Sequence, residues 1–322
     1  MGPLKFSPIL KRIRWGGRRL GDLLGKPICA HSDYAESWEI CDHGADQSVV
    51  AEGPYRGRRL DSLVREFPHE LFGRHEDLGQ FPLLIKFLDA HDRLSVQVHP
   101  NDDEACRYMP GERGKTEAWV ILATEPQSCI YAGLKAGVDE AALRAAIATG
   151  SVEECLNRVQ VVPGDCIFIP AGAVHAIGEG ILLAEVQQSS DITFRLFDWD
   201  RVGPDGAPRP LHIDQALASI DFQLGPLSKA TPVAIREVDH PVEELVNCRY
   251  FTIRRHTIAE TMTMPDERRC RILIVLGGLL SCESRDGSQE LAVGETMLLP
   301  ADSLPVRLDP ETPSVVLEVF WD

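Results

Sequence analysis

The segment Gly164-Asp-Cys-Ile-Phe-Ile-Pro-Ala-Gly-Ala-Val-His175 constrains the fold of this chain more than any other segment. Its apolar stretch, residues 166–169, stands between a Gly-Asp turn and a Pro-Ala-Gly turn, and His175 follows where another strand would begin. We therefore predict a β-hairpin edge that delivers one imidazole. Most other segments also consist of short apolar runs separated by Gly, Pro and Asp, which favours a β-sandwich or barrel.

Two upstream segments supply candidate metal ligands to accompany that histidine. In Leu94-Ser-Val-Gln-Val-His-Pro100, the alternation of a strand places Gln97 and His99 on the same face. Glu117 stands where the next apolar segment begins. Two imidazoles, one carboxylate and one amide oxygen suit a divalent metal of the zinc type and leave room for water or substrate. We therefore predict one Zn²⁺ bound by Gln97, His99, Glu117 and His175.

A few segments have the pattern of helices instead of strands. Short helices are predicted at 61–67 and 68–72, and the clearest helix at 137–148, where Asp139 can cap the start and Thr149-Gly150 closes the end. A further short helix is predicted at 152–157. The last two fall between the segments of Glu117 and His175, so we expect a small helical insertion, about 137–158, on one flank of a β-core.

A weak internal repeat indicates a second β-unit. Gly294-Glu-Thr-Met-Leu-Leu-Pro-Ala301 parallels Gly164-Asp-Cys-Ile-Phe-Ile-Pro-Ala171, but Pro305 stands where the first copy has His175. We predict two units joined near 225–232: residues 1–228, with the metal and the insertion, and residues 229–322, without metal ligands.

Composition narrows the class of protein. The chain has 33 basic and 49 acidic residues, a formal charge of −16, which argues against binding nucleic acid. Its nine cysteines are scattered and are interpreted as reduced thiols. No apolar run approaches 18 residues and no signal-peptide pattern begins the chain, so we predict no membrane association and a cytoplasmic location.

The motifs resemble those of a known family. Gly164, Pro170, Gly172 and His175 have the spacing of the second cupin motif, and the predicted ligand set is similar to the metal site of the type I mannose-6-phosphate isomerases. Segments 11–20, 36–39, 83–90 and 194–198 also resemble family segments, in family order. The resemblance implies a mainly β fold of two cupin jelly-roll β-barrel units in the compact bacterial form. It further implies a zinc-dependent isomerase that interconverts mannose 6-phosphate and fructose 6-phosphate through an enediol.

The resemblance also suggests roles for individual side chains. Catalytic roles are expected for Arg195, Lys115, Glu185 and Asp191, and substrate binding for Lys86 and Ser95. The cations would stabilise the negative charge of an enediol-like transition state, and a desolvated carboxylate could carry the proton. The sequence leaves open which cation holds phosphate and whether Glu185 is instead a structural partner of an arginine.

Other functions stay open at this point. A non-catalytic cupin that senses a sugar or sugar phosphate is one alternative, and another metal-cupin enzyme, such as a different sugar isomerase, is a second. Gln97 in place of the first histidine of the usual His-x-His pair argues against a cupin dioxygenase. The expected partner is a small sugar phosphate, with the protein a monomer or weak homodimer.

Overall fold

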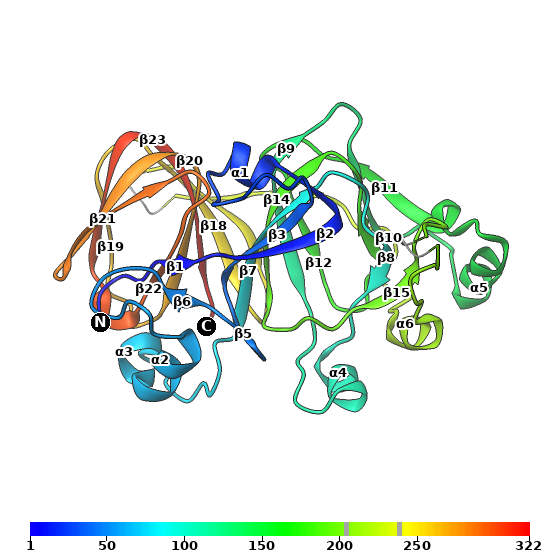
Figure 1. Ribbon diagram of the computed structural model, residues 1–322, viewed down its shortest axis with the longest axis horizontal. Helices are drawn as coiled ribbons and strands as arrows, with labels where there is room; N and C mark the ends of the chain where they lie inside the picture. Colours follow the sequence, from blue (N-terminus) through cyan, green and yellow to red (C-terminus); the bar gives the residue numbers. More distant parts are fainter. Residues whose placement is uncertain (203–205, 237–239) are drawn as a thin grey trace.

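The protein is described by a computed structural model that covers residues 1–202, 206–236 and 240–322. It is mainly β, as the sequence predicts, and is built from stacked sheets with helices at the periphery (Figure 1). The six-stranded sheet has the order β12 (Cys166–Ile169), β9 (Glu117–Thr124), β14 (Ile181–Gln188), β7 (Leu83–Ala90), β3 (Tyr34–Ile40) and β2 (Ile9–Gly17). The five-stranded sheet has the order β11 (Leu156–Gln160), β10 (Cys129–Leu134), β13 (His175–Ile177), β8 (Val96–Val98) and β15 (Phe194–Phe197).

The C-terminal part forms an eight-stranded sheet of its own. Its order is β16 (Val233–Ile235), β17 (Val242–Asn247), β18 (Thr252–Ile258), β23 (Val306–Phe320), β20 (Arg271–Ser284) and β21 (Gly287–Ala292); β19 (Met262–Met264) pairs with β23, and β22 (Thr296–Leu299) with β20. Two short pairs complete the described strands: β1 (Phe6–Ser7) with β6 (Val49–Val50), and β4 (Asp42–His43) with β5 (Asp46–Gln47).

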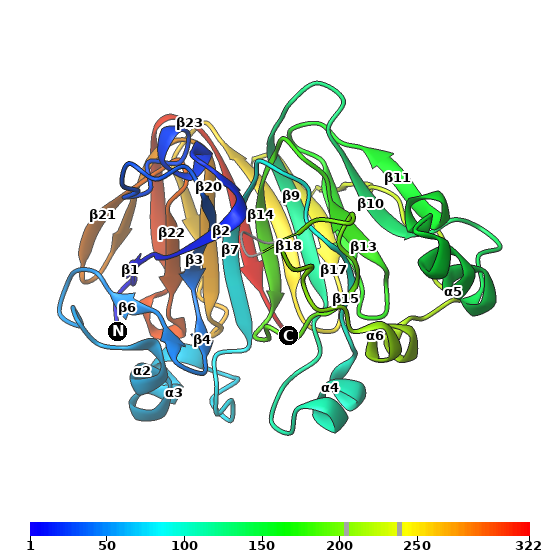
Figure 2. The same cartoon turned by 45° about the vertical axis from the view of Figure 1, so that its right-hand side comes forward.

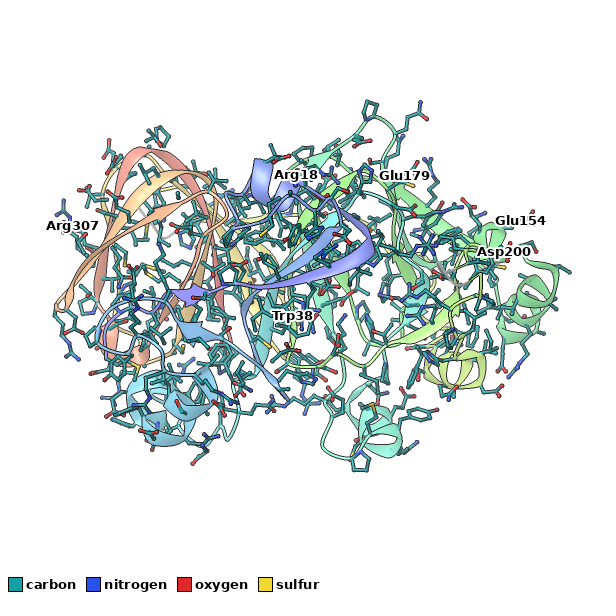
Figure 3. All side chains as sticks on the ribbon, in the orientation of Figure 1. Arg18, Trp38, Glu154, Glu179, Asp200 and Arg307 are labelled. Carbon is teal, nitrogen blue, oxygen red and sulfur yellow. The ribbon has the colours of Figure 1, made fainter. Side chains whose placement is uncertain are left out.

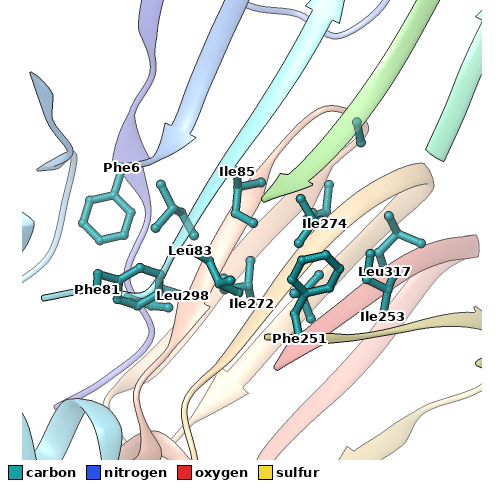
Figure 4. Packing of buried hydrophobic residues seen from close by; sticks show 14 of the residues in the cluster. Phe6, Phe81, Leu83, Ile85, Phe251, Ile253, Ile272, Ile274, Leu298 and Leu317 are labelled. Atoms are coloured by element: carbon teal, nitrogen blue, oxygen red, sulfur yellow. The ribbon is translucent and has the colours of Figure 1, made fainter. Parts of the chain in front are cut away.

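The six-stranded sheet is the middle layer, and its central strands are buried on both faces. Along β9, Ala118 and Val120 belong to the core shared with the C-terminal sheet, whereas Trp119 and Ile121 face the core shared with the five-stranded sheet. Every residue of β7 and β14 is buried, as expected for strands covered on both sides. Figure 4 shows the first of these cores, where Leu83 and Ile85 of β7 pack near Ile272, Ile274 and Leu317.

Helices cover the outer face of the five-stranded sheet and the ends of the sheets. The described helices are α1 (Arg19–Asp22), α2 (Leu60–Glu66), α3 (Pro68–Phe72), α4 (Asp102–Tyr108), α5 (Glu140–Thr149) and α6 (Ile213–Ser219), with short 3₁₀ turns η1 (Val152–Cys155) and η2 (Ala301–Ser303). Leu143 of α5 and Leu217 of α6 pack in one core with residues of β8 and β10. The predicted cap is present, since Asp139 accepts a hydrogen bond from Ala142 N and Gly150 is left-handed.

Two local predictions are corrected. The helix predicted at 152–157 ends at Cys155, because Leu156 is buried and pairs with Leu134 as the start of β11. The segment 164–175 is not a hairpin. Its first strand, β12, pairs with β9, and its second, β13, pairs with β10 and β8, so the Pro170–Gly172 turn carries the chain from one sheet to the other.

The predicted repeat is visible in the structure. Gly164 and Gly294 both have positive φ, each stands two residues before a four-residue strand, β12 or β22, and a proline follows each strand. The division at residues 228/229 stays a prediction, although the eight-stranded sheet draws all its strands from later residues. The two parts run alongside each other (Figure 2), and the N-terminal segment reaches the second part through a bridge between Leu4 and Leu298.

Candidate active site

Three of the four predicted metal ligands meet between the five- and six-stranded sheets. His175 comes from β13, His99 follows β8, and Glu117 begins β9. One ligand atom from each lies within 4.8 Å of the others, and all three residues are buried. This cluster is the one group of three or more such side chains with this geometry in the described residues. The three side chains meet because the chain passes from one sheet to the other at Pro170–Gly172. Ile169 still pairs with Glu117, whereas His175 pairs with Gln97.

Backbone carbonyls fix both imidazoles. His99 Nδ1 lies 2.9 Å from the carbonyl of Ile192, and His175 Nδ1 lies 2.9 Å from the carbonyl of Ala173. A ring nitrogen facing a carbonyl oxygen carries the proton, so each Nε2 keeps its lone pair. Each Nε2 lies 3.5 Å from an oxygen of Glu117. Both histidines therefore present their metal-binding nitrogen to the carboxylate.

Glu117 is suited to a cation. Both of its carboxylate oxygens are buried without a hydrogen-bond partner, although Lys115 Nζ lies 2.8 Å from Oε2. Burial opposes its ionisation, but the charge of Lys115 and the adjacent imidazoles of His99 and His175 outweigh burial and hold the pKa of Glu117 well below its usual value. Burial also lowers the pKa of His99 to about 3 and lowers that of His175. An ionised carboxylate and two neutral imidazoles form a donor set that fits a divalent metal such as zinc.

The fourth predicted ligand, Gln97, lies beside the cluster. Its Nε2 is 3.2 Å from His175 Nε2. Turning the amide by 180° would present Oε1 at the same place, so Gln97 can offer an oxygen to an ion held by the other three residues.

A cavity of about 590 Å³ opens above the cluster. All the side chains predicted to bind or transform substrate line this one cavity, together with two of the metal ligands: Lys86, Ser95, Gln97, Lys115, Glu117, Glu185, Asp191 and Arg195. These side chains belong to both sheets and are up to a hundred or more positions apart in the sequence, so only the fold places them together. Asp191 is exposed at the edge, whereas Lys86, Lys115 and Glu185 are buried.

Lys86 and Glu185 form the charged wall of the cavity. Lys86 Nζ lies 3.7 Å from Glu185 and 3.6 Å from Glu36, and Trp119 Nε1 donates a hydrogen bond of 3.0 Å to Glu185. Burial and the nearby charge of Glu117 raise the pKa of Glu185 to about 7. Burial opposes the charge on Lys86, but Glu36 and Glu185 outweigh it and raise its pKa. The sequence left open that Glu185 is a structural partner of an arginine. This is corrected, because the cation beside Glu185 is Lys86.

Arg195 and Ser95 are in direct contact. Arg195 Nε donates to Ser95 Oγ at 3.3 Å, and Arg195 Nη1 donates to the carbonyl of Pro210 at 2.9 Å. Among the described residues, no carboxylate is hydrogen-bonded to this guanidinium, and its two acceptors are neutral. It is therefore available to an anionic group in the cavity.

Sequence reasoning missed several residues of this cavity. The indole ring of Trp38, labelled near the centre of Figure 3, has two ammonium groups close to its centroid, that of Lys11 at 4.5 Å and that of Lys86 at 4.6 Å. Glu36 accepts a hydrogen bond of 2.6 Å from Trp38 Nε1. Strand alternation could have found Trp119, which lies two residues after Glu117 and so shares its face.

Another cavity, of about 630 Å³, holds none of the predicted site residues. Several of its charged groups are already engaged with one another: Arg201 pairs with Asp92 at 3.2 Å, and Tyr131 donates to Glu153 at 2.5 Å. We therefore place the candidate chemistry in the first cavity.

Stacked β-units with a buried His–Glu–His group define a cupin-like protein with a candidate metal centre. A family model described as the catalytic domain of type I phosphomannose isomerase matches residues 4–131. The mannose-6-phosphate isomerase ManA of Bacillus subtilis is 37% identical over 298 residues, which cover 92% of this chain and 93% of that protein. The mannose-6-phosphate isomerase of Streptococcus mutans is 36% identical over 299 residues, covering 92% of each. The chain belongs to the type I phosphomannose isomerase family.

Solved structures agree with this assignment. The crystal structure of the mannose 6-phosphate isomerase from Bacillus subtilis superimposes with a TM-score of 0.91 at 30% identity, covering 99% of both chains. A mutant phosphomannose isomerase from Salmonella typhimurium, 17% identical with a TM-score of 0.79, shares the fold. None of the helices in the described residues is long and apolar enough to cross a membrane.

Proposed function

We propose that this chain interconverts mannose 6-phosphate and fructose 6-phosphate with one bound zinc ion, through an enediol intermediate. The observation that carries the proposal is the buried His99–Glu117–His175 cluster in the same cavity as Lys86, Lys115 and Arg195. A phosphorylated sugar is an anion, and the described lining of this cavity has six basic side chains against five acidic ones, a local excess of basic groups in a chain whose formal charge is −16.

The isomerisation moves a proton between C1 and C2 and shifts the carbonyl, so negative charge develops on oxygen. Zinc held by Gln97, His99, Glu117 and His175 would supply Lewis acidity at that oxygen. Lys115 and Arg195 would add fixed positive charge, which stabilises the transition state more than the neutral ground state. Lys86 and Ser95 would hold the phosphate end.

Glu185 is our candidate for the proton carrier. A carboxyl with a pKa near neutrality can both accept and release a proton at the working pH, and burial raises the pKa of Glu185 to about 7. Asp191, at the edge of the cavity, is the other carboxylate predicted to be catalytic and lines the same space. The cytoplasmic location and the monomer or weak homodimer stay predictions.

A coupled assay tests the proposal. Purified protein should convert mannose 6-phosphate to fructose 6-phosphate, lose the activity on dialysis against a chelator, and recover it with one equivalent of zinc. Activity that survives complete metal removal would overturn the zinc requirement. No conversion by the zinc-loaded protein, with sugar-phosphate binding retained, would favour the sensing alternative.

A further inference from the structure

The carboxylate of Asp102 joins three segments that are distant in sequence. Its Oδ1 accepts hydrogen bonds from Gly114 N at 2.9 Å and from Gln188 Nε2 at 3.0 Å. Its Oδ2 accepts one from the hydroxyl of Tyr250 at 2.8 Å. Tyr250 lies in the turn between β17 and β18, so Asp102 connects the C-terminal part of the protein to the loop of α4, which extends from the end of the sheets (Figures 1 and 2).

The connection continues from Asp102 to the residues of the cavity. The amide of Gln188 donates to Asp102 through Nε2 and accepts from the backbone N–H of Thr116 through Oε1, at 2.9 Å. Because Asp102 accepts, the Gln188 amide is held in the one orientation that also satisfies Thr116 N–H. Thr116 stands between Lys115 and Glu117, and its Oγ1 accepts from Ala171 N at 3.3 Å, in the turn that leads to His175.

Close packing reinforces these hydrogen bonds. A Cβ on Gly114 would lie 2.5 Å from Asp102 N and 2.6 Å from Asn101 C, so only glycine lets the chain approach the start of α4 this closely. Lys115 N then donates to the carbonyl of Pro100 at 3.1 Å. The backbone that carries Lys115 and Glu117 is therefore held from both sides.

The charge state of Asp102 agrees with a tight link. Burial opposes ionisation, but the hydrogen bonds from Tyr250, Gln188 and Gly114 outweigh burial and lower the pKa of Asp102. Hydrogen bonds to an ionised acceptor are stronger than those between neutral groups. The hydrogen bonds of Asp102 therefore hold the turn of Tyr250, in the C-terminal part, firmly against the segment of Gly114.

We propose that Tyr250 and Asp102 are positioning residues, through which the C-terminal part fixes Lys115 and Glu117 at the metal-binding cavity. The predicted effect of these residues on turnover rests on the proposed function. It assigns the C-terminal part a task in the reaction even though no group of metal ligands was found among its described residues. Neither Tyr250 nor Asp102 lines the cavity, so they act through Gln188 and the 114–117 backbone.

Tyr250→Phe tests the link because it removes one oxygen atom and leaves the ring. Tyr131→Phe is the matched control, since its hydroxyl also donates to a carboxylate, Glu153, but on the side of the helical insertion. We expect Tyr250→Phe to lower kcat about three- to tenfold with little change in KM, and to speed zinc release to a chelator by a similar factor. Amide hydrogen exchange at 114–117 should also accelerate. Tyr131→Phe should leave all three measurements unchanged.

A second pair of variants separates positioning from general stability. Asp102→Ala should show a larger defect than Tyr250→Phe, and Asp102→Asn should regain part of it, because an amide oxygen still accepts from Gly114 N and Gln188. Wild-type kcat, zinc release and exchange in Tyr250→Phe, or a lowered unfolding temperature alone, would overturn the proposal. If the wild-type protein lacks isomerase activity, the proposed function fails, whereas exchange and zinc release still decide the link.

Discussion

The ammonium group of Lys115 lies 2.8 Å from a carboxylate oxygen of Glu117, two residues further along the chain. Lys115 lies just before β9, which begins at Glu117, and the short distance shows that the two side chains point toward each other. The same ammonium is 3.1 Å from His99 Nε2, so a fixed positive charge lies directly beside the candidate metal centre. We therefore expect Lys115 to contribute to turnover and not to metal binding.

Lys115→Met should retain zinc and lose turnover. The ammonium repels a nearby cation, so its removal should leave zinc affinity unchanged or higher, while kcat falls about 100-fold or more because one fixed charge at the developing oxyanion is lost. Zinc content by elemental analysis and steady-state kinetics on the same preparation check this. Loss of the metal in Lys115→Met would show that the lysine is needed to organise Glu117.

His99→Ala and His175→Ala should each bind zinc far more weakly than the wild-type protein. Each change removes one imidazole from a buried three-residue cluster and leaves too few strong ligands for tight binding. Equilibrium dialysis followed by elemental analysis measures the effect, with the exposed His91→Ala as the control. Undiminished metal content in both variants would rule out the site.

Arg195→Ala should lower kcat for mannose 6-phosphate about 100-fold or more while the zinc content stays the same. The guanidinium is held by Ser95 and the carbonyl of Pro210 beside the cavity, which suits it to developing negative charge. The exposed Arg14→Ala is the control. Near wild-type kcat with a large rise in KM would instead identify Arg195 as a phosphate anchor.

Glu185→Gln should change how the stability of the metal-free protein depends on pH. Burial raises the pKa of Glu185 from 4.5 to about 7 in the folded state, so the folded protein binds more protons than the unfolded chain between these values. This contribution to stability is fully present below pH 4.5 and is lost as the pH rises through 7. Chemical unfolding with chelator present should therefore show a larger gain from Glu185→Gln at pH 8 than at pH 5. Parallel pH profiles for Glu185→Gln and wild type would contradict the assignment; the exposed Glu260→Gln controls for charge loss.

The C-terminal part should bind no metal. Its most buried histidine, His256, is already 3.0 Å from Glu318, which also accepts from Arg271. Burial and the charges of Arg254 and Arg271 lower the pKa of His256 to about 4, and the same positive charges disfavour a cation. A crystal structure with anomalous scattering at the zinc edge would check this. A peak ligated by residues beyond 230 would show that the second unit keeps a site of its own.

The candidate ligands could be proposed from the sequence because the patterns that indicate them are local. Alternation along a strand places Gln97 and His99 on the same face. The Gly and Pro turns around 166–169 indicate a strand that is followed by His175. The cap at Asp139 and the repeat at Gly294 are local in the same sense. Each of these features depends on residues close together in the sequence, so it can be predicted before the fold is known.

Tertiary structure decided how these pieces meet. The strands before and after Pro170 belong to different sheets, and Leu156 joins a strand instead of a helix, because pairing partners distant in the chain override local pattern. Asp102 and Tyr250 are 148 residues apart, so no spacing rule relates them. Lys86 acquires Glu36 and Glu185 as neighbours only when β3, β7 and β14 pair. The sequence by itself determined which side chains can bind a metal and an anion, whereas sheet packing determined which of them share a cavity, since long-range contacts depend on the whole fold.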